Sequence, residues 1–472
     1  FGRAFGLNTY TLPGAFGHPA AMAATRRTAL WGLAALTLCQ LAAAEEEKPA
    51  EAKAEPPHEL PAVASVMFLG IFLAIGVYAM TQTSRPNVGN NTVLVLDNVI
   101  AIFLAVLWFQ GFDDLTELLP TAHHKFLAST IHASALLLAV CVASHLVRNK
   151  AVSIAIFCGA GAHYCAFASG HTSLAVQDAF FQDHPGICFL GTIIIFIALV
   201  AGGVVIYLIK RSMGYKPGEE SEEEGRNVFI DRFDDVETDF AGMALAMYWA
   251  VFVQFAIVGE FPEDGGDIDP GAKPTHTDTD RFIFLAYTVV LFVLGPLVIH
   301  KVSHLAGRTY LQSRLTGLFG SFVAMSIAFS FMNWGKMQLY EHEAVSVTPM
   351  MARVYFAAIC SFVAMSGIFL ISFLRCAWHK AAASALTALG LIAGYAWEET
   401  FDQAIDNMVD GTDHESSGKI CIALVSALII LPVYASFIKP KTMKAAEALE
   451  KAAEAAMEAT EEKAAAEEGG GP

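Results

Sequence analysis

The feature that most constrains the fold is a series of apolar blocks, each about 20 residues long, separated by shorter polar segments. A helix needs about this many residues to cross the roughly 30 Å hydrocarbon core of a bilayer. The 472-residue chain is 55% hydrophobic and only 16% charged, and its apolar runs are continuous. The strands of a membrane β-barrel would alternate instead. The pattern therefore predicts an all-α fold, a polytopic transmembrane helical bundle.

We predict about eleven membrane spans, taking each apolar block that is long enough to cross the bilayer. They cover residues 62–81, 92–112, 126–147, 151–176, 186–209, 240–259, 281–300, 314–335, 351–374, 382–401 and 419–438. Most are joined by short connections, which place consecutive helices antiparallel to one another. The bundle is therefore expected to be built of helical hairpins.

The charges of the connections predict the orientation of these hairpins. The positive-inside rule assigns connections rich in Lys and Arg to the cytoplasm. Every second connection carries such residues, namely Arg85, Arg148, Lys150, Lys210, Arg211, Lys301, Arg308, Arg314, Arg375, Lys380, Lys439, Lys441 and Lys444. The others are dominated by Asp and Glu, as in residues 260–280 and 398–415. We therefore expect basic cytoplasmic edges and acidic outer edges.

The N-terminal segment, residues 1–44, is read as a leader followed by a secretory signal peptide. Arg26 and Arg27 precede an apolar stretch at residues 29–41, and Ala42, Ala43 and Ala44 follow it. This order of a basic, an apolar and a small-residue region is typical of signal peptides. The alternative is an uncleaved signal anchor. A signal peptide predicts an integral membrane protein delivered by the secretory pathway to the plasma membrane, an endomembrane or a complex plastid.

Composition divides the rest of the chain into further parts. They are a disordered arm (45–61), a first membrane half of about five spans (62–213), an acidic cytoplasmic linker (214–239), a second membrane half of about six spans (240–443) and a charged helical tail (444–472). The linker is rich in Asp and Glu, and we interpret it as solvated chain. The tail contains pairs such as Glu447 and Lys451 at the i, i+4 spacing of a helix.

Asp97 is the clearest polar residue inside a predicted span. It lies about six residues into its span, on the order of 9 Å from the cytoplasmic edge. A proton or cation site and a buried Asp satisfied by neighbouring helices are equally open interpretations. His163 and His171 are eight residues apart, about 80° around one helix. They suit a proton relay or a metal or haem ligand, but structural histidines are the favoured interpretation.

Other polar residues near the span ends are also candidates for a transport pathway. They are Gln254, Glu260, Lys336, Glu398, Glu399 and Asp402. Lys336 lies near the outer end of its span, where snorkelling to the interface is the simplest interpretation. An ion pair with a carboxylate of another hairpin, such as Glu399, is the sharper alternative. A retinal Schiff base is disfavoured, because Lys336 is not in the last span.

A weak metal-site candidate lies in one acidic outer loop, at Glu341, His342 and Glu343. Carboxylate oxygens and imidazole suit Ca²⁺ or a transition-metal ion. The residues match neither an EF-hand loop nor an HExxH motif, so solvated acidic surface is the favoured alternative.

These observations lead to three hypotheses for function. The first is a cation or proton transporter or channel with an acidic extracytoplasmic vestibule, because intramembrane ionisable residues mark ion pathways. The alternative is a non-transporting membrane scaffold or sensor that binds partners through its acidic loops. The third is a haem- or retinal-binding membrane protein; no cofactor is otherwise indicated.

Enzymatic activity and nucleic-acid binding are not favoured. The sequence contains no P-loop, no dinucleotide fingerprint and no basic nucleic-acid patch. The expected partners are therefore the lipid bilayer and small cations, and the pattern does not specify an oligomeric state.

Overall fold

The computed structural model describes residues 71–116, 125–212, 224–262, 268, 276–305, 310–341, 349–373, 379–409, 415–448 and 451. Across these residues the chain is helical, without strands. The helices are Ile71–Thr81, α3 (Pro86–Thr116), α4 (Lys125–Leu146), α5 (Ala151–Phe180), α6 (Pro185–Ser212), α7 (Glu224–Val258), α8 (Asp278–Leu305), α9 (Tyr310–Leu339), α10 (Pro349–Phe373), α11 (His379–Val409), α12 (Glu415–Val433) and the π-helical segment η2 (Tyr434–Ile438), after which the helix continues to Ala448.

Nine helices within these described ranges are long and apolar enough to cross a membrane. They confirm the predicted class, an all-α polytopic helical bundle. Two of the eleven predicted spans are not among the nine. Only residues 71–81 of the first lie within the described part, as the short helix Ile71–Thr81. The tenth corresponds to α11, which is rich in Ala and Gly and runs into carboxylates.

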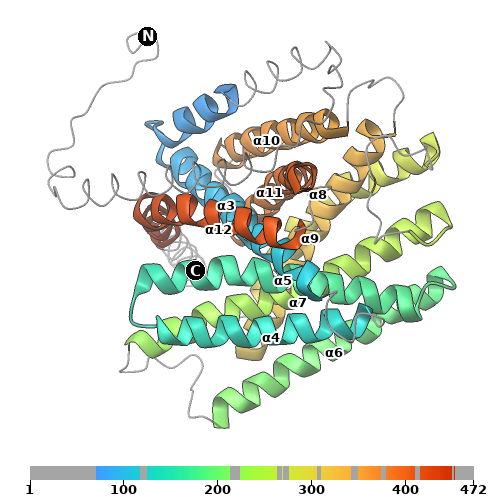
Figure 1. Ribbon diagram of the computed structural model, residues 1–472, viewed down its shortest axis with the longest axis horizontal. Helices are drawn as coiled ribbons and strands as arrows, with labels where there is room; N and C mark the ends of the chain where they lie inside the picture. The colour runs from blue at the N-terminus through green and yellow to red at the C-terminus, as the bar shows by residue number, and fades with distance from the viewer. Residues whose placement is uncertain are drawn as a thin grey trace, which may run out of the picture.

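The α11 helix forms the centre of the bundle. It packs against α3, α8, α9 and α10, and every residue from Ala388 to Ala396 is buried. Figure 1 shows it nearly end-on, with α3, α8, α9, α10 and α12 around it. A helix that is buried on all sides is enclosed by protein rather than by lipid. Small side chains at this position allow close packing, which explains why α11 is less hydrophobic than its neighbours.

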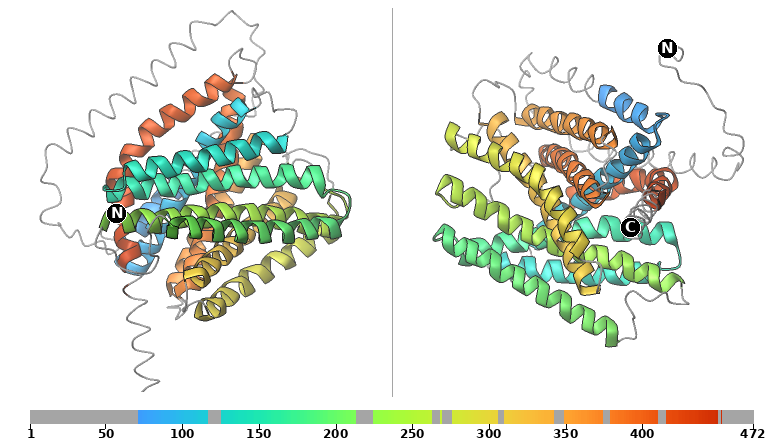
Figure 2. Two further views of the ribbon diagram at one scale, coloured as in Figure 1. Left: turned by 90° about the horizontal axis from the view of Figure 1, so that it is seen from below. Right: turned by 180° about the vertical axis from the view of Figure 1, so that it is seen from behind.

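The helices on either side of the predicted linker pack against one another. The α7 helix contacts α5 and α6 of the first predicted half as well as α9 of the second. The α3 helix contacts α5, but it also packs against α11 and α12. Figure 2 shows these helices as one interleaved bundle. The two sequence halves therefore do not form separate bundles in space, although they remain a convenient division of the sequence.

The expectation of a solvated linker at residues 214–239 is wrong for its described part. Residues 224–239 are the first turns of α7. Phe229, Phe233 and Val236 are buried there against Ile154 and neighbouring residues of α5. Their i, i+4, i+7 spacing places them on one helix face, so that the carboxylates between them lie on the others. The apolar stripe, rather than the abundance of Asp and Glu, decides the structure of this segment.

The predicted helical tail begins within the last helix, which reaches Ala448. Lys451 Nζ contacts Glu447 Oε1 at 2.7 Å, so the predicted i, i+4 pair is present. Both side chains are well exposed, and the pair therefore contributes little to stability. The remainder of the tail lies outside the described residues, as do the leader and signal peptide (1–44) and the arm (45–61).

The hairpin pattern makes a testable prediction about sidedness. A tag inserted after Gly265 and a tag at the C-terminus are expected on opposite sides of the membrane, because an odd number of spans separates them. In sealed microsomes we expect added protease to digest the C-terminal tag and to spare the tag after Gly265 until detergent is added. Digestion of both tags without detergent would contradict the predicted orientation.

Candidate functional site

The structure gives Asp97 two partners inside the bundle. The carboxylate lies on α3 and is 7% exposed. The Tyr434 hydroxyl donates a hydrogen bond to Oδ1 at 2.7 Å, and the Lys439 ammonium pairs with Oδ2 at 2.8 Å. Tyr434 and Lys439 are themselves buried, with 1% and 9% exposure. Both carboxylate oxygens are therefore satisfied by residues more than 300 positions away in the sequence.

The π-helical segment η2 explains how Tyr434 and Lys439 reach the same carboxylate. Residues five apart in an α-helix lie about 140° apart around its axis. In η2 the Lys439 N–H donates to the Tyr434 carbonyl, which closes a wider i→i+5 turn and brings the two side chains toward one side. Pro432, which has no N–H to donate, lies just before this segment. Single π-helical turns occur frequently at functional sites.

The α5 helix supplies the third wall of this site. A Cβ atom on Gly159 would lie 3.4 Å from Lys439 Nζ, so the ammonium group lies close against the α5 backbone. His163 lies one turn further along α5 from Gly159 and is 8% exposed, so α5 also places a buried imidazole beside this site. We call Asp97, His163, Tyr434 and Lys439 the Asp97 junction. Small residues on α5 allow this close approach.

The Asp97 junction is chemically able to exchange a proton or a cation. Burying an ion pair removes two charges from water, and this desolvation offsets much of their mutual attraction. A proton or small cation on Asp97 would replace the Lys439 ammonium as the partner of the carboxylate. Such an exchange would alter the contact between α3 and the residues that follow α12.

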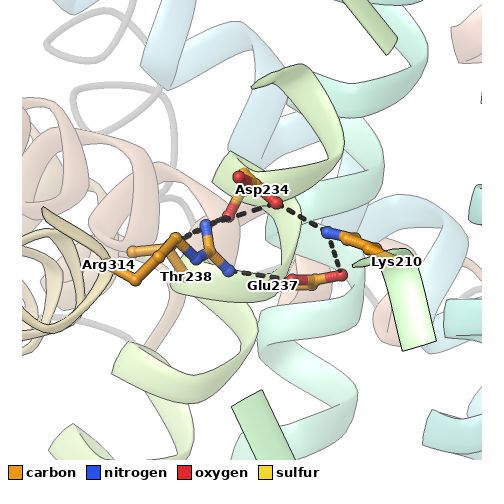
Figure 3. Close-up of polar contacts among 5 residues, drawn as sticks. All are labelled: Lys210, Asp234, Glu237, Thr238 and Arg314. Carbon is orange, nitrogen blue, oxygen red and sulfur yellow. Dashed lines mark hydrogen bonds and ion pairs between the residues drawn. The ribbon is translucent and has the colours of Figure 1, made fainter. Parts of the chain in front are cut away.

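A second group of charges, the inner charge cluster, joins α6, α7 and α9. Lys210 Nζ lies 2.6 Å from Asp234 Oδ1 and 2.8 Å from Glu237 Oε1. Arg314 donates to Glu237 Oε2 at 2.8 Å and to Thr238 Oγ1 at 3.0 Å. Figure 3 shows Lys210 and Arg314 approaching the α7 carboxylates from opposite sides. These residues lie at helix ends that the sequence predicts to be cytoplasmic, and the cluster ties three helices together there.

At the opposite end of the bundle, several predicted acidic residues are paired with cations. Lys336 contacts the Glu399 carboxylate, so the ion pair considered from the sequence is present. Lys419 Nζ lies 3.0 Å from Asp406 Oδ1. Pairing of this kind weakens the negative potential that the sequence suggests for a vestibule.

Glu341, one of the three weak metal-ligand candidates, is also paired. Its side chain is 1% exposed and contacts Arg281 Nη2 at 3.2 Å and His276 Nδ1 at 2.6 Å. His342 and Glu343 lie outside the described residues. Among the residues that are described, no group of three or more His, Cys, Asp or Glu side chains is arranged to hold a metal ion.

The remaining pathway candidates lie at separate places. His171 is exposed on α5, with its ring 4.6 Å from the centroid of the Phe109 ring. Gln254 is buried on α7, and Glu260 is exposed just beyond the end of that helix. Glu398 and Asp402 are half-buried in the C-terminal half of α11. Of the predicted residues, Asp97 with His163 and Lys336 with Glu399 are brought together.

Sequence reasoning missed Tyr434 and missed the role of Lys439. The sequence predicts Lys439 only as a basic residue at the cytoplasmic end of a span, and it gives no signal for Tyr434. One signal for the pairing of Lys439 with Asp97 is present in the sequence. Lys439 lies at the cytoplasmic end of one predicted span, and Asp97 lies near the cytoplasmic end of another. The sequence does not predict the π-helical turn that brings the Tyr434 and Lys439 side chains together.

Comparison with known proteins does not assign this chain to a family. No family model matches the chain, and neither the curated proteins nor the solved structures contain a significant match. The fold nevertheless defines the class: the chain is an integral membrane protein of multi-pass α-helical type.

Proposed function

We propose that this protein moves protons or another small cation across its membrane, and that the Asp97 junction is the exchange site. The observation that supports the proposal is a carboxylate buried inside the bundle with an ammonium partner and a hydroxyl partner. Ionisable groups within membrane segments are costly, face the bundle interior and are generally associated with ion or proton pathways. Here the partner of the ionisable group is a specific residue, Lys439.

The proposed step is competition at the carboxylate. A proton that binds Asp97 neutralises it and removes the attraction that holds Lys439. A metal cation would compete with the ammonium group for the same two oxygens. In both cases the Lys439 ammonium loses its ion pair with α3, while the Tyr434 hydroxyl can still donate to an oxygen of Asp97. This couples ion binding to a movement of the last helix.

A scaffold or sensor without transport is the second candidate. It is favoured by the apolar packing of the largest buried cluster, whose residues come mainly from α3, α5, α7, α8, α9, α10 and α11. A bundle that is packed in this way resists the rearrangement that transport requires. A haem- or retinal-binding protein ranks third, and a visible absorption spectrum of the purified protein tests it directly.

Ion flux in reconstituted vesicles distinguishes transport from scaffolding. Vesicles containing the wild type are expected to dissipate an imposed gradient of H⁺, Na⁺, K⁺ or Ca²⁺ faster than protein-free vesicles. Asp97→Asn is expected to reduce the rate to that of protein-free vesicles, because the exchangeable carboxylate is lost. Asp178→Asn is the matched control, since Asp178 is exposed at the end of α5 and away from the junction.

The outcomes separate the two candidates. Wild-type flux in Asp97→Asn would exclude the junction as the exchange site, and Glu398→Gln then tests the outer part of α11. Absence of flux for all four ions with correctly folded wild type would overturn the transport proposal and leave the scaffold.

A further inference from the structure

The α6 helix is attached to the bundle mainly at its two ends. Near its start, Gln177 Nε2 donates to Cys188 Sγ, and a Cβ atom on Gly191 would lie 2.9 Å from the Phe181 ring. Near its other end, Lys210 joins the inner charge cluster. The buried residues of α6 are confined to Cys188, Gly191 and Thr192. Between these attachments α6 lies at the edge of the bundle (Figures 1 and 2).

The middle of α6 is separated from α7 and α9 by open space. Gly202 and Gly203 are exposed, and a Cβ atom on either would meet no other atom within 4 Å. A cavity of about 180 Å³ lies here, with walls from α4, α6, α7 and α9, and Lys210, Glu237 and Arg314 among its lining. The charged cluster therefore forms part of the wall of an otherwise mainly apolar space.

A second cavity shares two lining residues with the first one. It measures about 360 Å³ and lies between Phe196 of α6, Leu245 of α7 and residues 312–319 of α9. Both cavities are lined by Leu315 and Leu318, so we describe them together as the α6 groove. Along α6 the groove runs from Lys210 to Phe196, a rise of about 21 Å at 1.5 Å per residue. One bilayer leaflet contributes roughly 15 Å of hydrocarbon.

The side of α6 that faces away from the bundle is apolar and exposed. Val205 and Leu208 are each 54% exposed, as expected for side chains that contact lipid. The groove therefore lies beside the hydrocarbon of the bilayer, and its charged end lies at the predicted cytoplasmic boundary, where lipid headgroups are found. Length, polarity and position all match one lipid molecule of the surrounding membrane.

The charges of the cluster indicate which headgroup fits. Lys210 and Arg314 carry two positive charges, and Asp234 and Glu237 carry two negative ones, so the net charge is zero. An anionic headgroup would approach the carboxylates as closely as the cations and would gain no net attraction. A zwitterionic headgroup has both signs, and its phosphate and ammonium groups can face the cations and the carboxylates respectively.

Arg314 retains donors for such a phosphate. A guanidinium group has five N–H donors. Its contacts with the described residues use three of them, to the Asp234 carbonyl, Thr238 Oγ1 and Glu237 Oε2. Lys210 has three donors, and its ion pairs with the described residues involve two carboxylates, Asp234 and Glu237. The cluster is therefore able to keep its internal pairs while it binds a phosphate.

We propose that the α6 groove binds one zwitterionic phospholipid of the bilayer, with its headgroup at the inner charge cluster and an acyl chain along Leu315 and Leu318. The lipid fills the space between α6 and α9. In this arrangement it completes the packing of a helix that the protein itself holds mainly at its two ends.

Native mass spectrometry of the purified full-length protein tests this proposal. After detergent washing, the protein is incubated with phosphatidylethanolamine, phosphatidylcholine or phosphatidylglycerol. The wild type is expected to retain one zwitterionic lipid per chain. Gly203→Phe is expected to lose this bound lipid, because its ring enters the groove. Val205→Phe, which adds the same ring on the exposed lipid-facing side of α6, is expected to retain it.

Two comparisons decide how lipid retention is interpreted: the folding of the variants and the binding of lipids with different headgroups. Circular dichroism and thermal unfolding of both Phe variants show whether Gly203→Phe is folded. If it is misfolded, Gly203→Leu replaces it with a smaller side chain. Equal lipid retention by a folded groove-filling variant would overturn the proposed site. Stronger binding of phosphatidylglycerol than of either zwitterionic lipid would overturn the headgroup assignment, and absence of any retained lipid on the wild type would overturn the proposal as a whole.

Discussion

Asp97→Asn is expected to lower the free energy of unfolding by about 3–5 kcal/mol, the usual cost of removing one partner of a buried ion pair. The substitution preserves the size of the side chain, but it leaves the Lys439 ammonium buried at 9% exposure without its counter-ion. The Tyr434 hydroxyl can still donate to the amide oxygen, so this hydrogen bond does not account for the loss. Unfolding in detergent micelles by titration with a denaturing detergent measures the effect.

The double variant Asp97→Asn with Lys439→Met distinguishes loss of the Asp97–Lys439 ion pair from non-specific destabilisation of the fold. It removes both charges, and its stability is expected to return most of the way to that of the wild type, because no unpaired charge remains. A double-mutant cycle then gives the coupling energy of the pair. The exposed Asp178→Asn control is expected to change stability by less than about 0.5 kcal/mol. If Asp97→Asn costs no more than this control, the two charges are not coupled as the structure indicates.

The double variant also strengthens the flux experiment. It is expected to be folded and yet unable to exchange an ion, because the carboxylate is absent. Loss of flux in a stable double variant would therefore reflect lost chemistry rather than lost structure. Full flux in the double variant would contradict the proposed function even if the predicted stability changes are observed.

Gly394→Leu is expected to be the most damaging packing substitution on α11. A Cβ atom at this position would lie 2.7 Å from Ile102 Cδ1 and 3.2 Å from Ile102 Cβ on α3. Gly390, one turn earlier, would meet Asn98 Cβ at 2.9 Å. The two glycines therefore form the surface on which α3 lies, four residues apart on one helix face. Overpacking typically costs about 1–3 kcal/mol, and a leucine against a neighbouring helix is expected at or above the top of this range.

Gly202→Leu is the matched control for this substitution. The chemical change is identical, but a Cβ at Gly202 meets no atom within 4 Å. Thermal unfolding is measured in lipid-free detergent, so that no lipid occupies the groove lined by Gly202, and is expected to show a clear loss for Gly394→Leu and little change for Gly202→Leu. Comparable stability of the two variants would contradict the close packing of α3 on α11. Because Asn98 adjoins Asp97, the α11 substitution is also expected to disturb the Asp97 junction.

Much of the fold was predictable because membrane insertion is decided locally. A run of apolar residues of sufficient length forms a helix in lipid whatever its neighbours are, since its backbone groups must pair within the segment. This is why the helical class and most spans were predicted correctly. The prediction failed at residues 224–239, where the abundance of charge was given more weight than the buried stripe of Phe229, Phe233 and Val236.

The candidate site was predictable only in part. Asp97 and His163 attracted attention because polar groups within apolar runs are unusual, and Lys336 with Glu399 was suggested by their similar depth. Each of these signals belongs to a single position in the sequence. The partners Tyr434 and Lys439 depend on the π-helical turn, and the inner charge cluster depends on how α6, α7 and α9 are placed side by side.

The sequence by itself determined that this is a multi-pass helical membrane protein with basic residues predicted at one set of helix ends and acidic residues at the other. These properties follow from hydropathy and charge along single segments. Only the tertiary structure decided that α11 is central, that Asp97 meets Lys439, and that α6 leaves a groove at the edge of the bundle. Such features depend on the register and rotation of helices that lie far apart in the chain, and these are set by the packing of side chains between helices.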